Sequence, residues 1–208
     1  MPEPIRKRLS REESRAQTRG RLLDSARELF IKAGIEATSI EQVTEAAGYS
    51  RGAFYSNFES KDALICAVLE LELRKQQQRL DAIFSIEPNA NRMAAIRNFY
   101  LDFATDVEGC LFLVSMQMYA LQHPGIRLKI AELLRSDRFT MVEKARIVVE
   151  ELEKLGTPSP ASPEVLVLSL QAQALGMCVS HMVEHESIDS EQIRQALLLT
   201  FDHLAHFK

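Results

Sequence analysis

The sequence predicts an all-α protein of about nine helices, and three observations lead to this prediction. Apolar residues recur at three- and four-residue spacing along almost the whole chain, which is the period of an amphipathic helix. No stretch alternates apolar and polar residues in the way that a half-buried strand does. The interruptions are short and contain proline or glycine, as residues 87–89, 123–125 and 156–163 show.

The composition is typical of a globular protein without a membrane anchor. The 208 residues are 46% hydrophobic and 26% charged, and this length allows a small domain beside a larger one. The basic run at residues 6–8 is followed by polar residues, so that no signal peptide is expected. Glutamines interrupt the apolar runs at 110–121 and 165–180, which therefore fall short of the ~18 clean residues of a membrane span. We expect a cytoplasmic protein whose three cysteines are buried thiols.

The charge of the chain is distributed unevenly. Residues 1–21 contain seven basic and three acidic side chains, a net charge of +4, which leaves −8 for the rest of a chain whose total is −4. Residues 1–14 are accordingly predicted to form a basic arm. On charge alone, an arm that touches DNA and a solvated tail are equally good interpretations of this segment.

Two helices are expected before residue 48. The first covers residues 15–33 and stops at Gly34. The second begins after a capping residue, either Thr38 or Ser39, because each precedes a glutamate or glutamine by three positions. Gly48 ends this second helix, which is only about two and a half turns long.

Seven further helices complete the prediction. Ser50 can cap a short helix from Arg51 to about Phe58, and Ser60 can cap a long one that begins at Lys61 and runs towards residue 84. The remaining helices are expected at about 90–106, 109–122, 125–155, 163–186 and 190–206.

The second and third helices are joined by a turn that is typical of a helix-turn-helix motif. Gly48 permits the left-handed conformation that ends a helix, Tyr49 follows it, and Ser50 caps the next helix. In this motif the second of the two helices enters the major groove of DNA.

The third helix has two different faces. Successive residues advance by about 100°, which places Phe54 and Phe58 together on the side that packs on the preceding helices. The opposite surface offers a guanidinium, a phenol, a hydroxyl and a bare stretch of backbone, from Arg51, Tyr55, Ser56 and Gly52. This combination suits a DNA groove better than a solvated helix.

Each residue of this surface has a chemical reason to contact DNA. Arg51 can bond the acceptors of guanine, Gly52 allows close approach, and Ala53 can touch a thymine methyl group. Polar groups suited to phosphate oxygens are contributed by Tyr55, Ser56, Asn57, and by the helix amino termini at Ser39 and Lys61.

The first 60 or so residues resemble the amino-terminal domain of TetR-family transcriptional regulators. The motifs that carry the resemblance are RLLDSA at 21–26, ATSI at 37–40, AGYSRGAFYSNF at 47–58 and SKDAL at 60–64, in the order and spacing of the family. The resemblance implies a DNA-binding domain at residues 15–75 and an effector-binding and dimerisation domain at 76–208. It implies DNA contacts by Thr38, Ser39, Ser50, Arg51, Gly52, Ala53, Tyr55, Ser56, Asn57 and Lys61.

The sequence departs from the common family pattern at two positions. Asn57 stands where histidine is frequent, and asparagine can still bond a phosphate. Tyr49 stands where a smaller aliphatic residue is usual, and it is either a packing residue or an additional DNA contact.

The resemblance also places an effector pocket among the middle helices of the second domain. Aromatic and methionine side chains in this region make adaptable pocket walls, although core packing is the more common role of such residues. The candidate residues for a largely apolar effector are Phe99, Phe103, Phe112, Met116, Tyr119 and Met177.

The last two helices are expected to form the dimer interface. In the family they pair with the same helices of a second subunit, which suits the two-fold symmetry of a palindromic operator. Packing within one chain is the alternative. The candidate interface residues are Leu168, Ala172, Leu175, Val179, Leu197, Phe201 and Leu204.

Other chemistry finds little support in the sequence. Cys178, His181 and His185 share one helix face, but the further ligands of a metal site are not evident, and no metal or cofactor is expected. No histidine follows a glutamate by three positions, as a di-iron enzyme of this fold class requires, and the common catalytic motifs are missing. A helical adaptor that binds protein remains the alternative to a DNA-binding repressor released by a small molecule.

Overall fold

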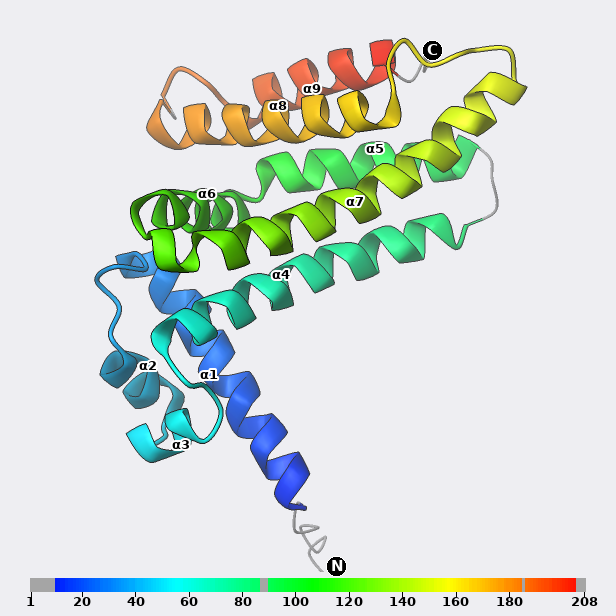
Figure 1. Cartoon of the computed structure of the whole chain (residues 1–208). Helices are drawn as coiled ribbons and strands as arrows, with labels where there is room; N and C mark the ends of the chain where they lie inside the picture. Colours follow the sequence, from blue (N-terminus) through cyan, green and yellow to red (C-terminus); the bar gives the residue numbers. More distant parts are fainter. Residues whose placement is uncertain (1–9, 87–89, 185, 205–208) are drawn as a thin grey trace, which may run out of the picture. The chain divides into compact units, whose positions relative to one another are not determined.

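The computed structural model describes residues 10–86, 90–184 and 186–204 (Figure 1). The described residues form nine helices and no strand, which confirms the all-α prediction. The helices are α1 (Arg11–Ala33), α2 (Ile40–Ala47), α3 (Arg51–Tyr55), α4 (Lys61–Phe84), α5 (Ala90–Thr105), α6 (Val107–Gln122), α7 (Pro124–Lys154), α8 (Pro163–Val183) and α9 (Ser190–Leu204).

The chain divides into two compact units, Met1–Leu69 and Glu70–Lys208. The boundary lies inside α4, six residues before the end that we expected for the first domain at residue 75. An uninterrupted helical pattern gives no local signal for a division, because helix periodicity is unchanged where the packing partners change.

α1 begins four residues earlier than expected, inside the segment that we interpreted as an arm. The hydroxyl of Ser10 accepts a hydrogen bond from the N–H of Glu13 (3.1 Å), and the carboxylate of Glu13 accepts one from the N–H of Ser10 (2.7 Å). This reciprocal capping box stabilises the start of a helix at Arg11. Residues 1–9 of the predicted arm lie outside the described residues.

The amino-terminal unit is organised around a small aromatic core. α2 packs on α1 and α3 packs on α2. Leu22 and Phe30 of α1, Val43 of α2 and Phe54 of α3 are almost fully buried, and so is Phe58 after α3. Each short helix is therefore held by side chains that point inwards, which leaves its other face in solvent.

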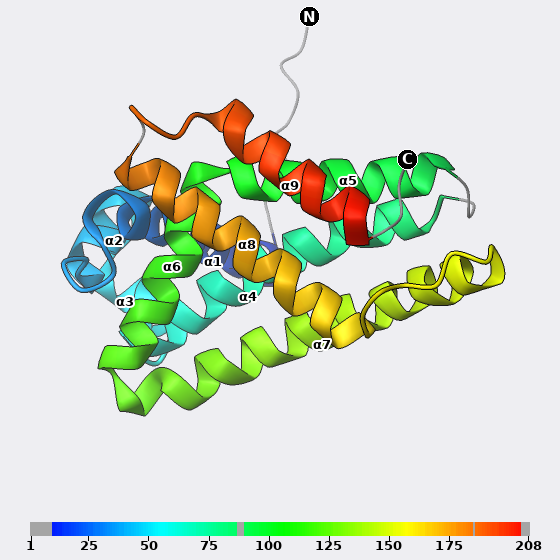
Figure 2. The ribbon, with the colours of Figure 1, turned by 90° about the horizontal axis from the view of Figure 1, so that it is seen from above.

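The carboxy-terminal unit is a helical assembly in which α8 has a central place. α8 packs against α5, α6, α7 and α9, and α9 also packs against α5. α8 and α9 lie side by side in both Figure 1 and Figure 2. One buried cluster joins α5, α8 and α9 and consists of Leu101, Ala104, Ala174, Ile193 and Leu197. A second consists of Ile96, Leu170 and Phe201.

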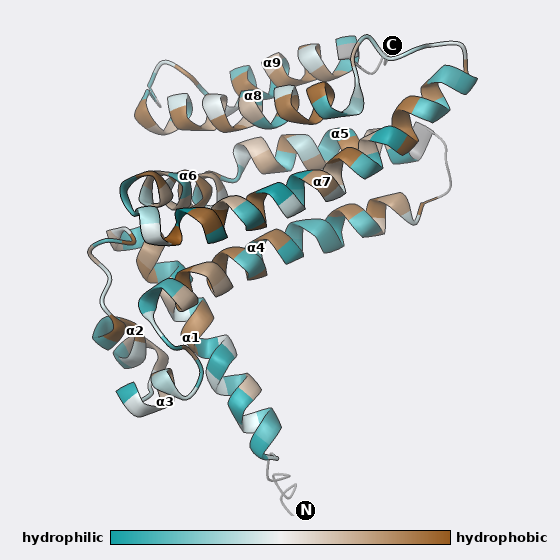
Figure 3. Ribbon diagram, viewed as in Figure 1, coloured by the Kyte–Doolittle hydropathy of each residue, from teal (hydrophilic) through white to brown (hydrophobic). Residues whose placement is uncertain are grey.

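α8 is more apolar than the sequence interpretation allowed. Figure 3 shows hydrophobic residues along most turns of α8, and by length and composition this helix could cross a membrane. An 18-residue window of α8 has a mean hydropathy of 1.4 in spite of its glutamines. Only 22% of that window is buried within the chain. Many of its other residues are half-buried, and the apolar side chains of Val165, Leu168 and Val183 are exposed.

Candidate nucleic-acid interface and ligand cavity

The turn between α2 and α3 has the geometry that the sequence predicts. Gly48 adopts φ 74°, in the left-handed region, where any other side chain except asparagine or aspartate is strained. The N–H of Gly48 donates to the carbonyl oxygen of Glu45 (3.1 Å), and that of Tyr49 to Thr44 (2.8 Å). The turn therefore ends α2 with the carbonyl groups of Thr44 and Glu45 satisfied and directs the chain into α3.

Two serines that we assigned to DNA contact also act as helix caps. The hydroxyl of Ser39 accepts from the N–H of Gln42 (3.1 Å), and the side chain of Gln42 accepts from the N–H of Ser39 (2.7 Å). The hydroxyl of Ser50 accepts from the N–H of Ala53 (3.3 Å). These caps fix where α2 and α3 begin, and hence where their amino termini point.

α3 is shorter than expected, but its faces are as predicted. The helix ends at Tyr55, and hydrogen bonds from Ser56 N–H to Gly52 and from Phe58 N–H to Phe54 continue the turn beyond it. Phe54 and Phe58 are buried. Tyr55 is 51% exposed, and the other exposed residues of the outward surface are Arg51, Gly52 and Ser56. Ala53, Asn57 and Tyr49 are half-buried.

Arg51 is held between an acidic and an aromatic neighbour. Its guanidinium Nη1 lies 3.0 Å from Oε1 of Glu41 on α2, and its Cζ lies 5.9 Å from the centroid of the Tyr55 ring. The hydrogen bond with Tyr55, and secondly the charge of Glu41, raise the pKa of Arg51, so that it stays protonated. The contact with Glu41 was missed in the sequence, although an acidic residue in the first turn of the preceding helix could have indicated it.

Thr38 does not belong to the exposed surface. Its side chain is only 1% exposed, and its hydroxyl donates to the carbonyl oxygen of Gly34 (2.8 Å). This corrects the assignment of Thr38 as a DNA contact. Ser39 is the residue that caps α2, so Thr38 precedes the cap and closes the loop after α1.

Asn57 and Lys61 are engaged within the amino-terminal unit. The amide Nδ2 of Asn57 donates to the carbonyl of Ala53 (2.8 Å), and its buried Oδ1 has no partner among the described residues. Lys61 donates to the carbonyl of Glu36 (3.3 Å), and partial burial lowers the pKa of its ammonium group. Both residues stay candidates for phosphate contact, but each also stabilises the fold of the amino-terminal unit.

Two arginines of α1 bind the end of α3. Arg15 donates from Nη2 to the carbonyl of Ser56 (2.9 Å), and Arg19 donates from Nη1 to that of Asn57 (3.3 Å). The guanidinium carbon of Arg19 also lies 4.4 Å from the centroid of the Phe58 ring. Positive charge is favourable beside the carbonyl groups at the end of a helix. These two arginines, which contribute to the net positive charge of residues 1–21, therefore position the candidate recognition helix.

A cavity of about 300 Å³ lies within the carboxy-terminal unit. Phe99, Phe103 and Phe112 line it, as the sequence analysis proposed for an effector pocket. Among the other candidates, Met116 and Tyr119 are buried outside its lining. Met177 lines a separate shallow cavity on α8 and α9. Three of the six candidate residues therefore line this cavity. Its lining also includes polar residues that the sequence did not indicate.

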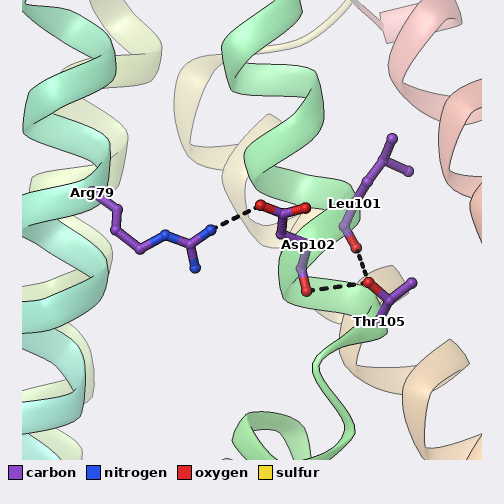
Figure 4. Close-up of polar contacts among 4 residues, drawn as sticks. All are labelled: Arg79, Leu101, Asp102 and Thr105. Carbon is purple, nitrogen blue, oxygen red and sulfur yellow. Dashed lines mark hydrogen bonds and ion pairs between the residues drawn. The ribbon is translucent and has the colours of Figure 1, made fainter.

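Side chains connect α4 to the helices around this cavity. In Figure 4 the guanidinium of Arg79 points at the carboxylate of Asp102 on α5, and the two groups are 2.9 Å apart. The hydroxyl of Thr105 donates to the carbonyl of Leu101 (2.9 Å) one turn back on the same helix. Arg79 also lies over the ring of Phe99, with 5.5 Å between Cζ and the centroid. This ion pair ties α4 to the aromatic wall of the cavity.

The predicted dimer residues separate into two groups. On α8, Leu168 and Ala172 are exposed, Leu175 and Val179 are half-buried, and the first three also line the cavity. On α9, however, Leu197 and Phe201 are 2% and 6% exposed and belong to the core clusters. Packing within the chain accounts for these two residues. The side chain of Leu204 lies outside the description.

The possible metal ligands have other roles. Nδ1 of His181 lies 2.6 Å from the carbonyl oxygen of Ile188, and His185 is outside the described residues. The buried thiol of Cys110 lies 3.9 Å from the carbonyl oxygen of Leu175, and burial raises the pKa of both Cys110 and Cys178. In the part of the chain that the structure describes, no group of three or more potential ligands could hold a metal ion.

The amino-terminal unit is similar to a known family of proteins. The sequence profile "Bacterial regulatory proteins, tetR family" matches residues 22–68. The transcriptional regulator AcrR of Shigella flexneri is 40% identical over 55 residues, which are 26% of this chain and 26% of AcrR. The curated relatives compared are matched over only 22% to 44% of their own length.

Solved structures resemble the chain over most of its length. GusR of Salmonella enterica has a TM-score of 0.71 at 21% identity, covering 96% of this chain and 100% of GusR. SmeT in complex with triclosan has a TM-score of 0.67 at 22% identity, covering 89% of this chain and 90% of SmeT. SmeT is the repressor of a multidrug efflux pump of Stenotrophomonas maltophilia. At such low identity these similarities show the fold.

Proposed function

The amino-terminal unit belongs to the TetR family of bacterial regulatory proteins, and from this premise we propose that the chain is a sequence-specific, DNA-binding transcriptional repressor. A small-molecule effector releases it from its operator. The observation that carries the proposal is the exposed surface of α3, where Arg51, Gly52 and Tyr55 project from a capped helix after a helix-turn-helix turn.

The division of labour on this surface follows from the chemistry of its groups. Arg51 reads base edges, because its planar guanidinium can bond two acceptors of guanine at once. Tyr55 and Ser56 bind phosphate oxygens, together with Ser39 at the start of α2. Their exposure supports this assignment, and the burial of Thr38 removes that residue from it.

A homodimer is the form that we propose binds DNA. A palindromic operator presents two half-sites about 34 Å apart, and one copy of α3 can occupy only one of them. The exposed apolar residues of α8 and α9, including Val165, Leu168 and Leu199, support a symmetric interface at these helices. Val165→Glu should convert the dimer to a monomer in sedimentation equilibrium, whereas Leu128→Glu, at a still more exposed apolar position on α7, should not.

The effector site of the proposal is the cavity of about 300 Å³. This volume is at the lower end of the range for small-molecule pockets, and its walls are largely aromatic and aliphatic. The complex of SmeT with triclosan is a precedent for a small molecule on this fold. An effector lowers operator affinity only if it binds the free protein more tightly than the DNA-bound protein.

The test is selection of bound fragments from genomic DNA, followed by sequencing and titration of the enriched sites. We expect a palindromic consensus and affinity for it at least about a thousandfold above random DNA. Equal affinity for enriched and random DNA would contradict the proposal and favour the helical adaptor. We propose a cytoplasmic location for the protein and no enzymatic activity.

A further inference from the structure

The carboxy-terminal unit contains two neighbouring cavities that differ in their charged lining residues. The smaller one, of about 90 Å³, is lined by apolar side chains and Lys144. The ammonium of Lys144 lies 2.6 Å from a carboxylate oxygen of Asp81 and 4.9 Å from the centroid of the Phe84 ring. The larger cavity is lined by three acidic side chains and a single basic one: Glu72, Asp106, Asp137 and Arg138. The lining of the larger cavity therefore has more acidic than basic side chains.

Two of the three acidic side chains are already engaged. The carboxylate of Glu72 lies 2.7 Å from the ammonium of Lys75 on the same helix. The carboxylate of Asp106 caps α6 by accepting from the N–H of Gly109 (3.0 Å). Their roles in the fold account for their presence, and Asp137 is left as the acidic group whose position at the cavity needs an explanation.

Asp137 is a buried carboxylate with few partners. It is 6% exposed on α7, and its Oδ1 accepts a hydrogen bond from Nε2 of Gln77 (3.1 Å). Within the described parts of the chain, no second hydrogen bond to Asp137 is present. Burial raises its pKa, while the hydrogen bond from Gln77 and the charge of Arg138 act in the other direction without compensating. A buried carboxylate is costly unless it is paired and fully hydrogen-bonded.

A second acceptor lies at the same cavity. Gln76, next to Gln77 on α4, lines the cavity, and its side-chain Oε1 is buried with no hydrogen-bond partner among the described residues. Most buried polar atoms in proteins have a partner. Asp137 and Gln76 both offer acceptor oxygens at the cavity, so the group that would satisfy them must donate, and beside a carboxylate it is best positively charged.

The remaining walls suit the body of such a ligand. Phe99, Phe103 and Phe112 line the cavity and provide apolar surface. Aromatic faces also attract an organic cation within about 6 Å of the ring centroid. A ligand with an aromatic or aliphatic body and one ammonium group matches the acceptors of Asp137 and Gln76 and the apolar surface of the phenylalanines.

We infer that the larger cavity binds an amphipathic organic cation, whose ammonium group donates hydrogen bonds to Asp137 and Gln76 while its hydrocarbon part lies against the three phenylalanines. The inference names the chemical class of the effector, and its regulatory meaning rests on the function proposed above. The binding itself can be measured without DNA.

The experiment compares three ligands of one shape on the full chain by isothermal titration calorimetry. They are 4,4-diphenylbutylammonium, the neutral 4,4-diphenylbutan-1-ol and the anionic 4,4-diphenylbutanoate. We expect the ammonium compound to bind at least about tenfold more tightly than the alcohol, because a charge-assisted hydrogen bond in a buried site is worth that factor or more. The carboxylate should bind most weakly.

Asp137→Asn keeps the shape of the side chain and removes its charge. It should abolish the preference for the ammonium compound and leave the affinity for the alcohol unchanged. Glu132→Gln, which neutralises an exposed carboxylate on the same helix outside the cavity, is the matched control and should keep the preference. Arg138→Gln removes the basic residue of the lining and should strengthen binding of the ammonium compound, which provides a second test at an exposed position.

Two results would overturn the inference: equal or tighter binding of the alcohol, or an ammonium preference that survives Asp137→Asn. Either result leaves the DNA-binding proposal intact, since operator selection is performed without ligand. Conversely, the ammonium preference can hold in a protein that fails to select an operator, in which case the regulatory proposal is wrong and the ligand class stands.

Discussion

The two units of the molecule carry their candidate functional residues in opposite ways. In the amino-terminal unit these residues lie on the outside of a short helix, while caps and backbone contacts hold that helix from within. In the carboxy-terminal unit they line an interior cavity formed by side chains from five helices. Exposed sites on one helix depend on local spacing, whereas an interior site depends on how distant segments pack. The following predictions test this contrast, from the largest expected effect to the smallest.

Truncation of a core side chain in the amino-terminal unit should have the largest effect on stability. Phe54 is fully buried, and Phe54→Ala should destabilise the amino-terminal unit by about 3 to 5 kcal/mol, from lost burial and the cavity that remains. Hydrogen exchange of the α1 to α3 amides would report this change locally. Phe139→Ala removes an equally large but exposed ring of α7 and should change stability by less than about 0.5 kcal/mol.

Removal of the guanidinium that we propose reads the bases should affect specificity and not stability. Arg51→Ala should cost about 1 to 3 kcal/mol on the selected operator and relax base preference at one position of each half-site. Lys61→Ala should instead weaken binding to all sequences alike and reduce the salt dependence by about one counterion. Gel-shift titrations at several salt concentrations distinguish the two. Identical losses on operator and random DNA would contradict this division.

The contacts from α1 to α3 should be worth less than the core but more than a surface charge. Arg19→Ala removes a hydrogen bond to the carbonyl of Asn57 and a cation–π contact with Phe58, for which we expect about 1 to 2 kcal/mol of lost stability. Thermal unfolding measures this loss. Arg21→Ala, at an exposed position of the same helix, is the control and should have little effect.

The buried carboxylate of the cavity should make stability depend on pH. Because burial raises the pKa of Asp137 in the folded state above its usual 3.8, the folded protein binds this proton more tightly than the unfolded chain does. Stability from this group is therefore lost as the pH rises from 3.8 through the raised value. Asp137→Asn should melt at a higher temperature than the unchanged protein at pH 7, and the difference should shrink towards pH 4.

The smallest effect is expected at Glu41. Its ion pair with Arg51 is exposed on both sides and should contribute only about 0.2 to 1 kcal/mol. Glu41→Gln frees Arg51 and removes a negative charge from the DNA-facing side, so operator affinity should rise by less than about tenfold, most clearly at low salt. A weaker operator complex would mean that Glu41 orients Arg51 for the groove.

The prediction from sequence was most successful where local rules decide the structure. Gly48 and the caps at Ser39 and Ser50 follow from short-range hydrogen bonding, and the inward position of Phe54 follows from helix periodicity. The same rules left one ambiguity, since Thr38 and Ser39 both have a capping partner three residues on. Only the structure shows that Ser39 caps and that Thr38 turns back to Gly34.

Prediction was less successful where the partner lies far away in the sequence. Leu197 and Phe201 have the apolar spacing of an interface, but α5 covers them. Asp137 and Gln77 are sixty positions apart, and nothing near either residue indicates a polar contact inside the unit. A periodic apolar pattern shows that one face of a helix is buried. It does not show whether another helix of the same chain or a second molecule covers that face.

The contacts of Arg15 and Arg19 have a consequence for how the DNA sequence recognised by the amino-terminal unit could change. Both arginines bind main-chain carbonyl oxygens, and every residue type presents the same carbonyl. The contacts that hold α3 in place thus do not depend on the identity of its outward side chains, provided that Phe54 and Phe58 remain to fill the core. Residues 51, 52, 55 and 56 can accordingly be replaced together. Evolution or engineering could then change the operator that α3 recognises, while the contacts that hold α3 in place stay the same.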